Sequence, residues 1–190
     1  MQIRWKDLVK IPNLLSLYRL ILGLIFPFLW KLEIQDKILL ILIGTAILSD
    51  TFDGNIARIF HQKTDLGKIL DPLADKVFIN MLFVLLYLNK NISLSFLSII
   101  LARDIAILSG ATLLYFKYPD QVKFSPTYLG KTCTVFQLIF LFMYFVHLFI
   151  NPLNDLLISI FSQLVIFFTL LSGFHYAFLF WKSFTKSPIR

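Results

Sequence analysis

The sequence has little cysteine and little charge. Its single cysteine, Cys133, excludes an intrachain disulfide and a cysteine-based zinc site. Only 15% of its 190 residues are charged, whereas a soluble domain carries about a quarter. No polar stretch is long enough for a second soluble domain, and there is no internal repeat or low-complexity linker. The N-terminal segment has no clean apolar run that ends in small residues, so we expect no cleaved signal peptide.

Apolar residues dominate instead. They make up 58% of the chain, which includes 21 phenylalanines. This composition predicts an integral membrane protein of the all-α class, with one helical domain over residues 1–190. The net charge is +7, and basic residues of membrane chains mark cytoplasmic loops and contacts with anionic lipids. No basic stripe with interleaved aromatic residues is present, so we do not expect nucleic acid as a partner.

Six apolar stretches are long enough to cross a bilayer, which takes about 20 residues. We predict transmembrane helices at Leu14–Trp30, Ile38–Ala57, Ile69–Leu88, Leu94–Phe116, Thr132–Ile150 and Leu156–Trp181. With the N-terminus in the cytoplasm, twelve lysines and arginines fall on the cytoplasmic side and three, Lys31, Lys37 and Lys90, on the other. The positive-inside rule therefore predicts cytoplasmic termini and a cytoplasmic loop between the second and third helices.

Four aspartates gather beside that loop. Helical spacing places two groups of residues each on one face of a helix, Asp50, Asp53, Gly54, Ala57 and Arg58 in the second predicted helix and Gly67, Asp71 and Asp75 in the third. One aspartate at the centre of a membrane helix costs about 2.5–3.5 kcal/mol, so four cost on the order of 10 kcal/mol. A divalent cation offsets that cost better than the few nearby cations of the chain.

Clustered carboxylates without thiols suit a hard ion, either Mg²⁺ or Mn²⁺. Mg²⁺ in proteins is commonly shared with substrate phosphates, which points to a phosphate-bearing substrate. Two alternatives remain for the aspartates, structural ion pairs and an acid-lined path of a membrane transporter. Gly54 and Ala57 are also typical of close helix packing.

From Asp50 to Asp75 the chain reads D-x₂-D-G-x₂-A-R-x₈-G-x₃-D-x₃-D. This motif resembles that of the CDP-alcohol phosphatidyltransferase family at all eight specified positions. The stretches "IPNLLSLYR" and "LDPLADK" resemble those of its phosphatidylglycerophosphate synthases and eukaryotic-type cardiolipin synthases. The resemblance implies a six-helix fold, commonly a homodimer, with a cavity open to the cytoplasm, here of a bacterial inner membrane.

The resemblance also implies a reaction. An acceptor hydroxyl attacks the phosphatidyl phosphorus of CDP-diacylglycerol, and CMP leaves. The matching positions are metal ligands at Asp50, Asp53, Asp71 and Asp75, which hold two Mg²⁺ or Mn²⁺ ions, and CDP contacts at Asp50, Gly54, Ala57, Arg58 and Gly67. Asp75 is the expected general base, because a carboxylate near the acceptor hydroxyl can take its proton.

The acceptor is less clearly marked. Phosphatidylglycerophosphate synthases usually carry a second arginine eight residues after the position of Arg103, where this chain has Ala111. The stretch "SPTYLGKTCTVFQL" resembles that of eukaryotic-type cardiolipin synthases. We therefore favour phosphatidylglycerol over glycerol 3-phosphate, with Arg103 and Lys131 as acceptor-binding residues. The alternative for Arg103 is a buried network with Asp104.

Overall fold

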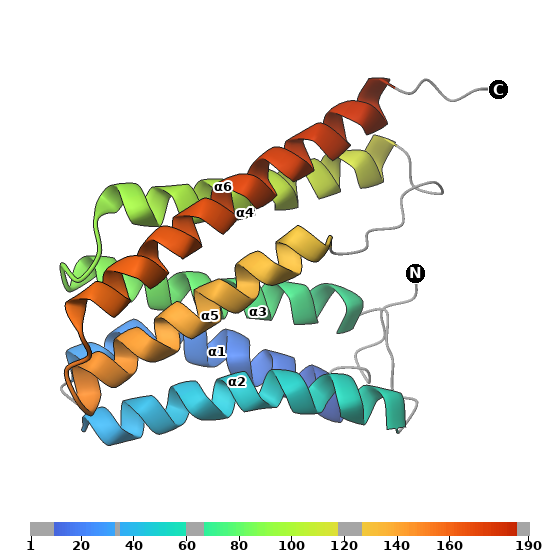
Figure 1. The fold of residues 1–190 in the computed structure, drawn as a ribbon. Helices are drawn as coiled ribbons and strands as arrows, with labels where there is room; N and C mark the ends of the chain where they lie inside the picture. The colour runs from blue at the N-terminus through green and yellow to red at the C-terminus, as the bar shows by residue number, and fades with distance from the viewer. Residues whose placement is uncertain (1–9, 33–34, 60–66, 118–126, 186–190) are drawn as a thin grey trace. The chain divides into compact units, whose positions relative to one another are not determined.

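Helices account for nearly all of the chain that can be described. The computed structural model describes residues 10–32, 35–59, 67–117 and 127–185, without the side chains of 50–59, 68–69, 111, 114–117 and 183–185. In order along the chain the helices are α1 (Ile11–Lys31), α2 (Asp36–Ile59), α3 (Gly67–Leu88), α4 (Leu94–Lys117), α5 (Tyr128–Phe149) and α6 (Asp155–Thr185) (Figure 1). The prediction of an all-α chain with six helices is confirmed over these ranges.

Helix α5 begins before the apolar stretch that predicted it, because a polar residue caps it. The Thr127 hydroxyl oxygen accepts a hydrogen bond from the backbone N–H of Gly130 at 3.1 Å, so α5 begins at Tyr128 rather than Thr132. Ser93 accepts one from Phe96 N–H at 3.2 Å at the start of α4, which begins at Leu94 as predicted. Hydropathy alone misses the first turn of α5 because its capping residue is polar.

The chain divides into two compact units. The N-terminal unit comprises Met1–Asn89 and Phe145–Pro152, and the C-terminal unit comprises Lys90–Tyr144 and Leu153–Arg190. The single-domain organisation stays a prediction.

In the N-terminal unit, α1 packs against both α2 and α3 (Figure 1). Gly23 of α1 lies so close to α3 that an added Cβ would be 3.0 Å from the Cα of Phe78. Such close approach of two backbones requires a small residue. Farther along α1, the fully buried Phe26 ring packs edge-on against Phe145, with ring centroids 6.4 Å apart. The first contact fixes α1 beside α3, and the second joins α1 to the last turns of α5.

In the C-terminal unit, α4 packs against α6. Aromatic rings join the remaining helix to both of these partners. Phe136 of α5 stacks on Phe168 of α6 at 4.4 Å between centroids, and Phe140 of α5 lies 5.3 Å from Phe96 of α4. This unit therefore has an apolar core with aromatic contacts among its three helices.

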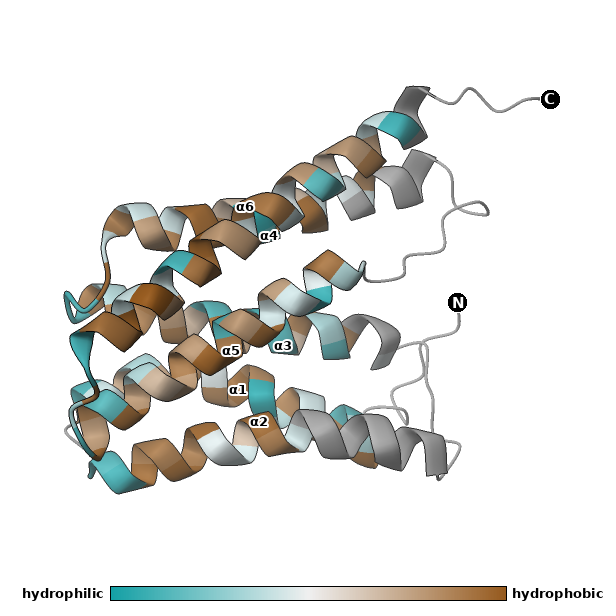
Figure 2. Ribbon diagram, in the orientation of Figure 1, coloured by the Kyte–Doolittle hydropathy of each residue, from teal (hydrophilic) through white to brown (hydrophobic). Residues whose placement is uncertain are grey.

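Three of the described helices are long and apolar enough to cross a membrane, namely α1, α5 and residues Asp155–Lys182 of α6. Figure 2 shows apolar residues along most of their length. Large apolar side chains such as Phe28, Phe174 and Trp181 are exposed, a surface that suits lipid rather than water. The chain is an integral membrane protein, and six transmembrane helices stay a prediction because length and composition identify three.

Candidate active site

One face of α1 carries buried polar side chains. Asn13, Ser16 and Arg19 follow each other at three-residue spacing, and all three are buried. Pro12 precedes them in the first turn, where its missing N–H leaves no helical bond unmade. We refer to these three residues as the α1 polar face. A buried arginine in an apolar chain needs an anionic or hydrogen-bonding partner, because burial of a lone charge costs several kcal/mol.

The partners of the α1 polar face are two of the predicted site residues on α3. Ser16 donates a hydrogen bond to a carboxylate oxygen of Asp71. Arg19 forms an ion pair with Asp75, with 2.8 Å from Nη2 to Oδ1. Asp71 and Asp75 are four residues apart and share one face of α3, as their spacing predicted. The structure thus brings both aspartates against the same neighbouring helix.

The two ends of the Arg19–Asp75 pair differ in exposure. The Arg19 side chain is 2% exposed, whereas that of Asp75 is 34% exposed. The guanidinium is therefore enclosed, and the carboxylate remains within reach of molecules outside the protein. Gly67, the third predicted site residue of this group, is buried at the start of α3.

The other half of the predicted site lies on α2. This helix continues to Ile59, so helical spacing holds from Asp50 to Arg58. The side chains of Asp50, Asp53, Ala57 and Arg58, and the surroundings of Gly54, lie outside the described part of the chain. Among the side chains that are described, no three histidine, cysteine or acidic groups come together. The metal and CDP assignments therefore remain predictions.

The predicted acceptor residues lie in the C-terminal unit. Arg103 of α4 is buried and donates hydrogen bonds from Nη1 to Asp104 Oδ1 at 2.6 Å and from Nη2 to Ser172 Oγ at 2.7 Å. Its Cζ lies 5.8 Å from the ring centroid of Tyr176, within the range of a cation–π interaction. The alternative of a buried Arg103–Asp104 network is confirmed.

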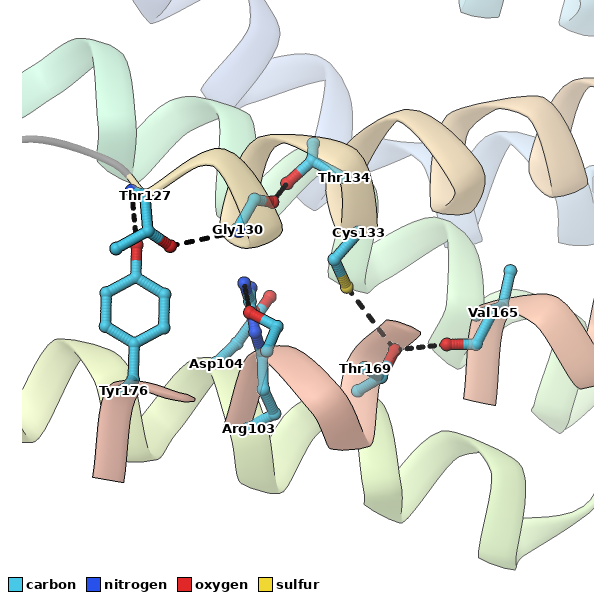
Figure 3. A network of polar contacts seen from close by, with 10 residues as sticks. Arg103, Asp104, Thr127, Gly130, Cys133, Thr134, Val165, Thr169 and Tyr176 are labelled. Atoms are coloured by element: carbon cyan, nitrogen blue, oxygen red, sulfur yellow. Dashed lines mark hydrogen bonds and ion pairs between the residues drawn. The ribbon is translucent and has the colours of Figure 1, made fainter. Parts of the chain in front are cut away.

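Tyr176 connects this network to α5. Its hydroxyl oxygen accepts a hydrogen bond from the backbone N–H of Thr127 at 3.1 Å, and Thr127 in turn caps α5 (Figure 3). Lys131 lies exposed in the first turn of α5. Arg103 and Lys131 therefore differ in exposure, and none of the described contacts joins them. Their roles in acceptor binding stay predictions.

Sequence reasoning missed four of these side chains, namely Ser16, Arg19, Ser172 and Tyr176. A signal for two of them was present, since Asn13, Ser16 and Arg19 are polar residues at helical spacing in an otherwise apolar helix. No comparable pattern marks Ser172 and Tyr176.

Comparisons with known proteins agree with the motif. The family model described as CDP-alcohol phosphatidyltransferase matches residues 9–181. A CDP-diacylglycerol–glycerol-3-phosphate 3-phosphatidyltransferase of Aquifex aeolicus is 36% identical over 133 residues, which cover 67% of this chain and 71% of that protein. An enzyme of the same name from Mycoplasma genitalium is 31% identical over 149 residues, covering 68% of this chain and 62% of that protein.

A relative of a second kind matches as well. A cardiolipin synthase (CMP-forming) of Rattus norvegicus is 34% identical over 146 residues, covering 68% of this chain and 47% of that protein. The match thus spans less than two thirds of the Mycoplasma and rat proteins. Relatives with both names are similar to this chain at comparable identity.

Proposed function

This chain belongs to the CDP-alcohol phosphatidyltransferase family, and on that premise we propose that it transfers the phosphatidyl group of CDP-diacylglycerol to an acceptor hydroxyl. The observation that carries the proposal is the complete family motif, whose Asp71 and Asp75 share one face of α3 beside the α1 polar face. The partly exposed carboxylate of Asp75 suits a group that acts on a bound molecule.

The donor set fits a hard cation, because it consists of aspartate oxygens. Asp50, Asp53, Asp71 and Asp75 would hold Mg²⁺ or Mn²⁺, with two ions proposed. When bound, the ions supply stabilisation of the negative charge on the diphosphate oxygens. Gly54, Ala57 and Gly67 present little side chain to the CDP part, and Arg58 can bind phosphate oxygens with two parallel N–H groups.

In the proposed reaction, the acceptor oxygen forms a bond to the phosphatidyl phosphorus and the bond from that phosphorus to the CMP oxygen breaks. Asp75 accepts the proton of the attacking hydroxyl. CMP leaves with both electrons of the broken bond, and no covalent enzyme intermediate is needed. Arg19 holds the carboxylate of Asp75 from the enclosed side while this proton is transferred.

Phosphatidylglycerol is the acceptor that we favour. Both terminal nitrogens of Arg103 already bond to Asp104 and Ser172, and Ala111 stands where a second arginine would bind phosphate. Glycerol 3-phosphate is the second candidate, because the Aquifex relative carries the name of a glycerol-3-phosphate enzyme.

The deciding experiment supplies the purified full chain with CDP-diacylglycerol, Mg²⁺ or Mn²⁺, and one acceptor at a time. We expect CMP release and a lipid product with the mass of cardiolipin. A product with the mass of phosphatidylglycerophosphate would show that the acceptor is glycerol 3-phosphate and not phosphatidylglycerol. Absence of CMP with every acceptor would contradict the enzyme assignment and favour the alternative of an acid-lined transporter.

The proposed setting is a bacterial inner membrane, with six spans, a homodimer and cytoplasmic termini. The buried Cys133 makes cysteine labelling a direct test of the orientation. A Lys90→Cys variant should react with a membrane-impermeant maleimide in intact cells, and a Lys10→Cys variant only after the membrane is opened. The reverse pattern would contradict the proposed orientation.

A further inference from the structure

We infer that Ser16 and Arg19 of the α1 polar face are positioning residues for the carboxylates of Asp71 and Asp75. The inference rests on the proposed function, because it takes these aspartates to be the metal- and acceptor-facing groups. It adds a third helix to the site, since the motif itself covers only α2 and α3.

The contacts form a regular series along α1 and α3. Ser16 is hydrogen-bonded to Asp71, Arg19 forms an ion pair with Asp75, and Gly23 lies against Phe78. Each step advances three or four residues on both helices, in the same direction. The two helices therefore run parallel in a fixed register, and every step of the series is one helical turn.

The close contact between Gly23 and Phe78 determines the distance between α1 and α3 at the other two contacts. A Cβ at Gly23 would lie 3.0 Å from the backbone of Phe78, so α1 cannot approach α3 in this way at a bulkier position. With that spacing fixed, the short Ser16 side chain reaches Asp71 and the long Arg19 side chain reaches Asp75. The lengths of the two side chains thus match the two carboxylates they hold.

Exposure distinguishes positioning from a purely structural ion pair. A structural pair in the interior encloses both charges, as Arg103 and Asp104 do with 6% and 1% exposure of their side chains. In the Arg19–Asp75 pair only the cation is enclosed, and the carboxylate is 34% exposed. The guanidinium therefore holds the carboxylate from behind and leaves its outer side accessible.

Metal binding without substrate provides the first test. Mn²⁺ alone is titrated into the full-length protein in lipid nanodiscs, and free Mn²⁺ is measured by electron paramagnetic resonance. Partners that orient metal ligands are typically worth about 10–100-fold in metal affinity or activity. We expect Arg19→Gln and Ser16→Ala to weaken Mn²⁺ binding by about 10-fold, and Arg19→Lys and Ser16→Thr to recover part of it.

The sign of the Arg19→Gln result decides between positioning and simple charge. Removal of a cation beside a metal-binding carboxylate would tighten Mn²⁺ binding if charge were its only effect. Loss of orientation weakens the binding instead. Unchanged or tighter binding in Arg19→Gln would overturn the inference. If that variant fails to fold, Ser16→Ala, which changes no charge, decides by the same measurement.

Turnover supplies the second readout. Arg19→Gln should lower kcat for CMP release by about 10–100-fold with little change in KM for CDP-diacylglycerol, because it disturbs groups that act in the chemical step. The matched control is Tyr18→Phe, which removes a hydrogen bond of 2.8 Å from α1 to Thr45 on α2 and leaves the α1 polar face intact. An equal loss of Mn²⁺ affinity in Tyr18→Phe would contradict the inference.

The two proposals can fail separately. Wild-type protein that binds Mn²⁺ with the expected dependence on Ser16 and Arg19, but releases no CMP, would support the positioning role and contradict the proposed function. Wild-type protein that binds no Mn²⁺ would overturn the positioning inference. An Asp71→Asn variant verifies that the measured ion occupies this site, since it should lose the binding.

Discussion

In the described part of each unit an arginine is buried beside an aspartate, and the two pairs are built differently. Arg19 meets Asp75 across two helices, whereas Arg103 meets Asp104, its neighbour in sequence. Asp75 is about one third exposed, and Asp104 is almost fully enclosed. A pair between helices can leave its carboxylate at a surface, while the pair within α4 is closed at both ends. The first arrangement suits a site that acts on substrate, and the second suits a structural network.

The largest expected effect comes from removing the charge of the accessible carboxylate. Asp75→Asn should lower CMP release by about 10²–10⁴-fold, because an amide cannot accept the acceptor proton. It should leave the thermal unfolding midpoint in detergent close to that of the wild type, since the amide has the same shape and the side chain of Asp75 is 34% exposed. Wild-type turnover in this variant would exclude Asp75 as the general base.

The next largest expected effect is a difference in the free energy of unfolding between variants of the two arginines. Arg103→Met should lower the free energy of unfolding by about 3–5 kcal/mol, because it leaves the Asp104 carboxylate enclosed without its guanidinium. Arg19→Met should cost only about 1 kcal/mol, because water reaches the partly exposed Asp75. Unfolding in mixed micelles measures both changes.

A double variant serves as the control for the enclosed pair. Arg103→Met combined with Asp104→Asn should recover much of the stability lost by Arg103→Met, because no enclosed charge remains. Equal losses of stability in Arg19→Met and Arg103→Met would contradict the distinction between a partly exposed and an enclosed ion pair. A rise in KM for the acceptor in an Arg103→Lys variant would support the predicted binding role of Arg103.

A smaller effect tests the close approach of α1 and α3. Gly23→Ala should destabilise the protein by about 1–3 kcal/mol, because the new methyl group meets the backbone of Phe78. Gly44→Ala is the matched control on α2, where an added Cβ meets nothing within 4 Å. The control should be neutral or slightly stabilising, since alanine favours the helix. Similar losses in both variants would contradict the role of Gly23 in the packing.

The smallest expected effect lies at the start of α5. Tyr176→Phe removes the acceptor of the Thr127 N–H and should cost about 1 kcal/mol in the free energy of unfolding. Tyr128→Phe is the control, because Tyr128 is almost fully exposed and its change should stay within about 0.5 kcal/mol. A neutral Tyr176→Phe would show that the cap of Thr127 on Gly130 holds α5 without help from α6.

Local patterns in the sequence predicted much of the fold and part of the candidate site. Apolar stretches predicted all six helices, and motif spacing placed Asp71 and Asp75 on one face of α3, because helical periodicity is a property of neighbouring residues. The start of α4 at Leu94 was predicted correctly, whereas the start of α5 was missed by hydropathy because Thr127, which caps it, is polar. The assignments of Asp50, Asp53 and Arg58 depend on the motif, since their side chains lie outside the described residues.

Composition was thus sufficient to predict an integral membrane protein of helices, and the resemblance of its motif indicated the phosphatidyltransferase family. The pairing of Arg19 with Asp75, and the enclosure of Arg103 by Asp104, Ser172 and Tyr176, required the packed structure. The physical reason is that helical periodicity assigns a residue to a face of its own helix, whereas the partner of that face depends on how closely helices approach. At Gly23 that approach is set by a missing side chain, which places a serine and an arginine of α1 against the aspartates of α3.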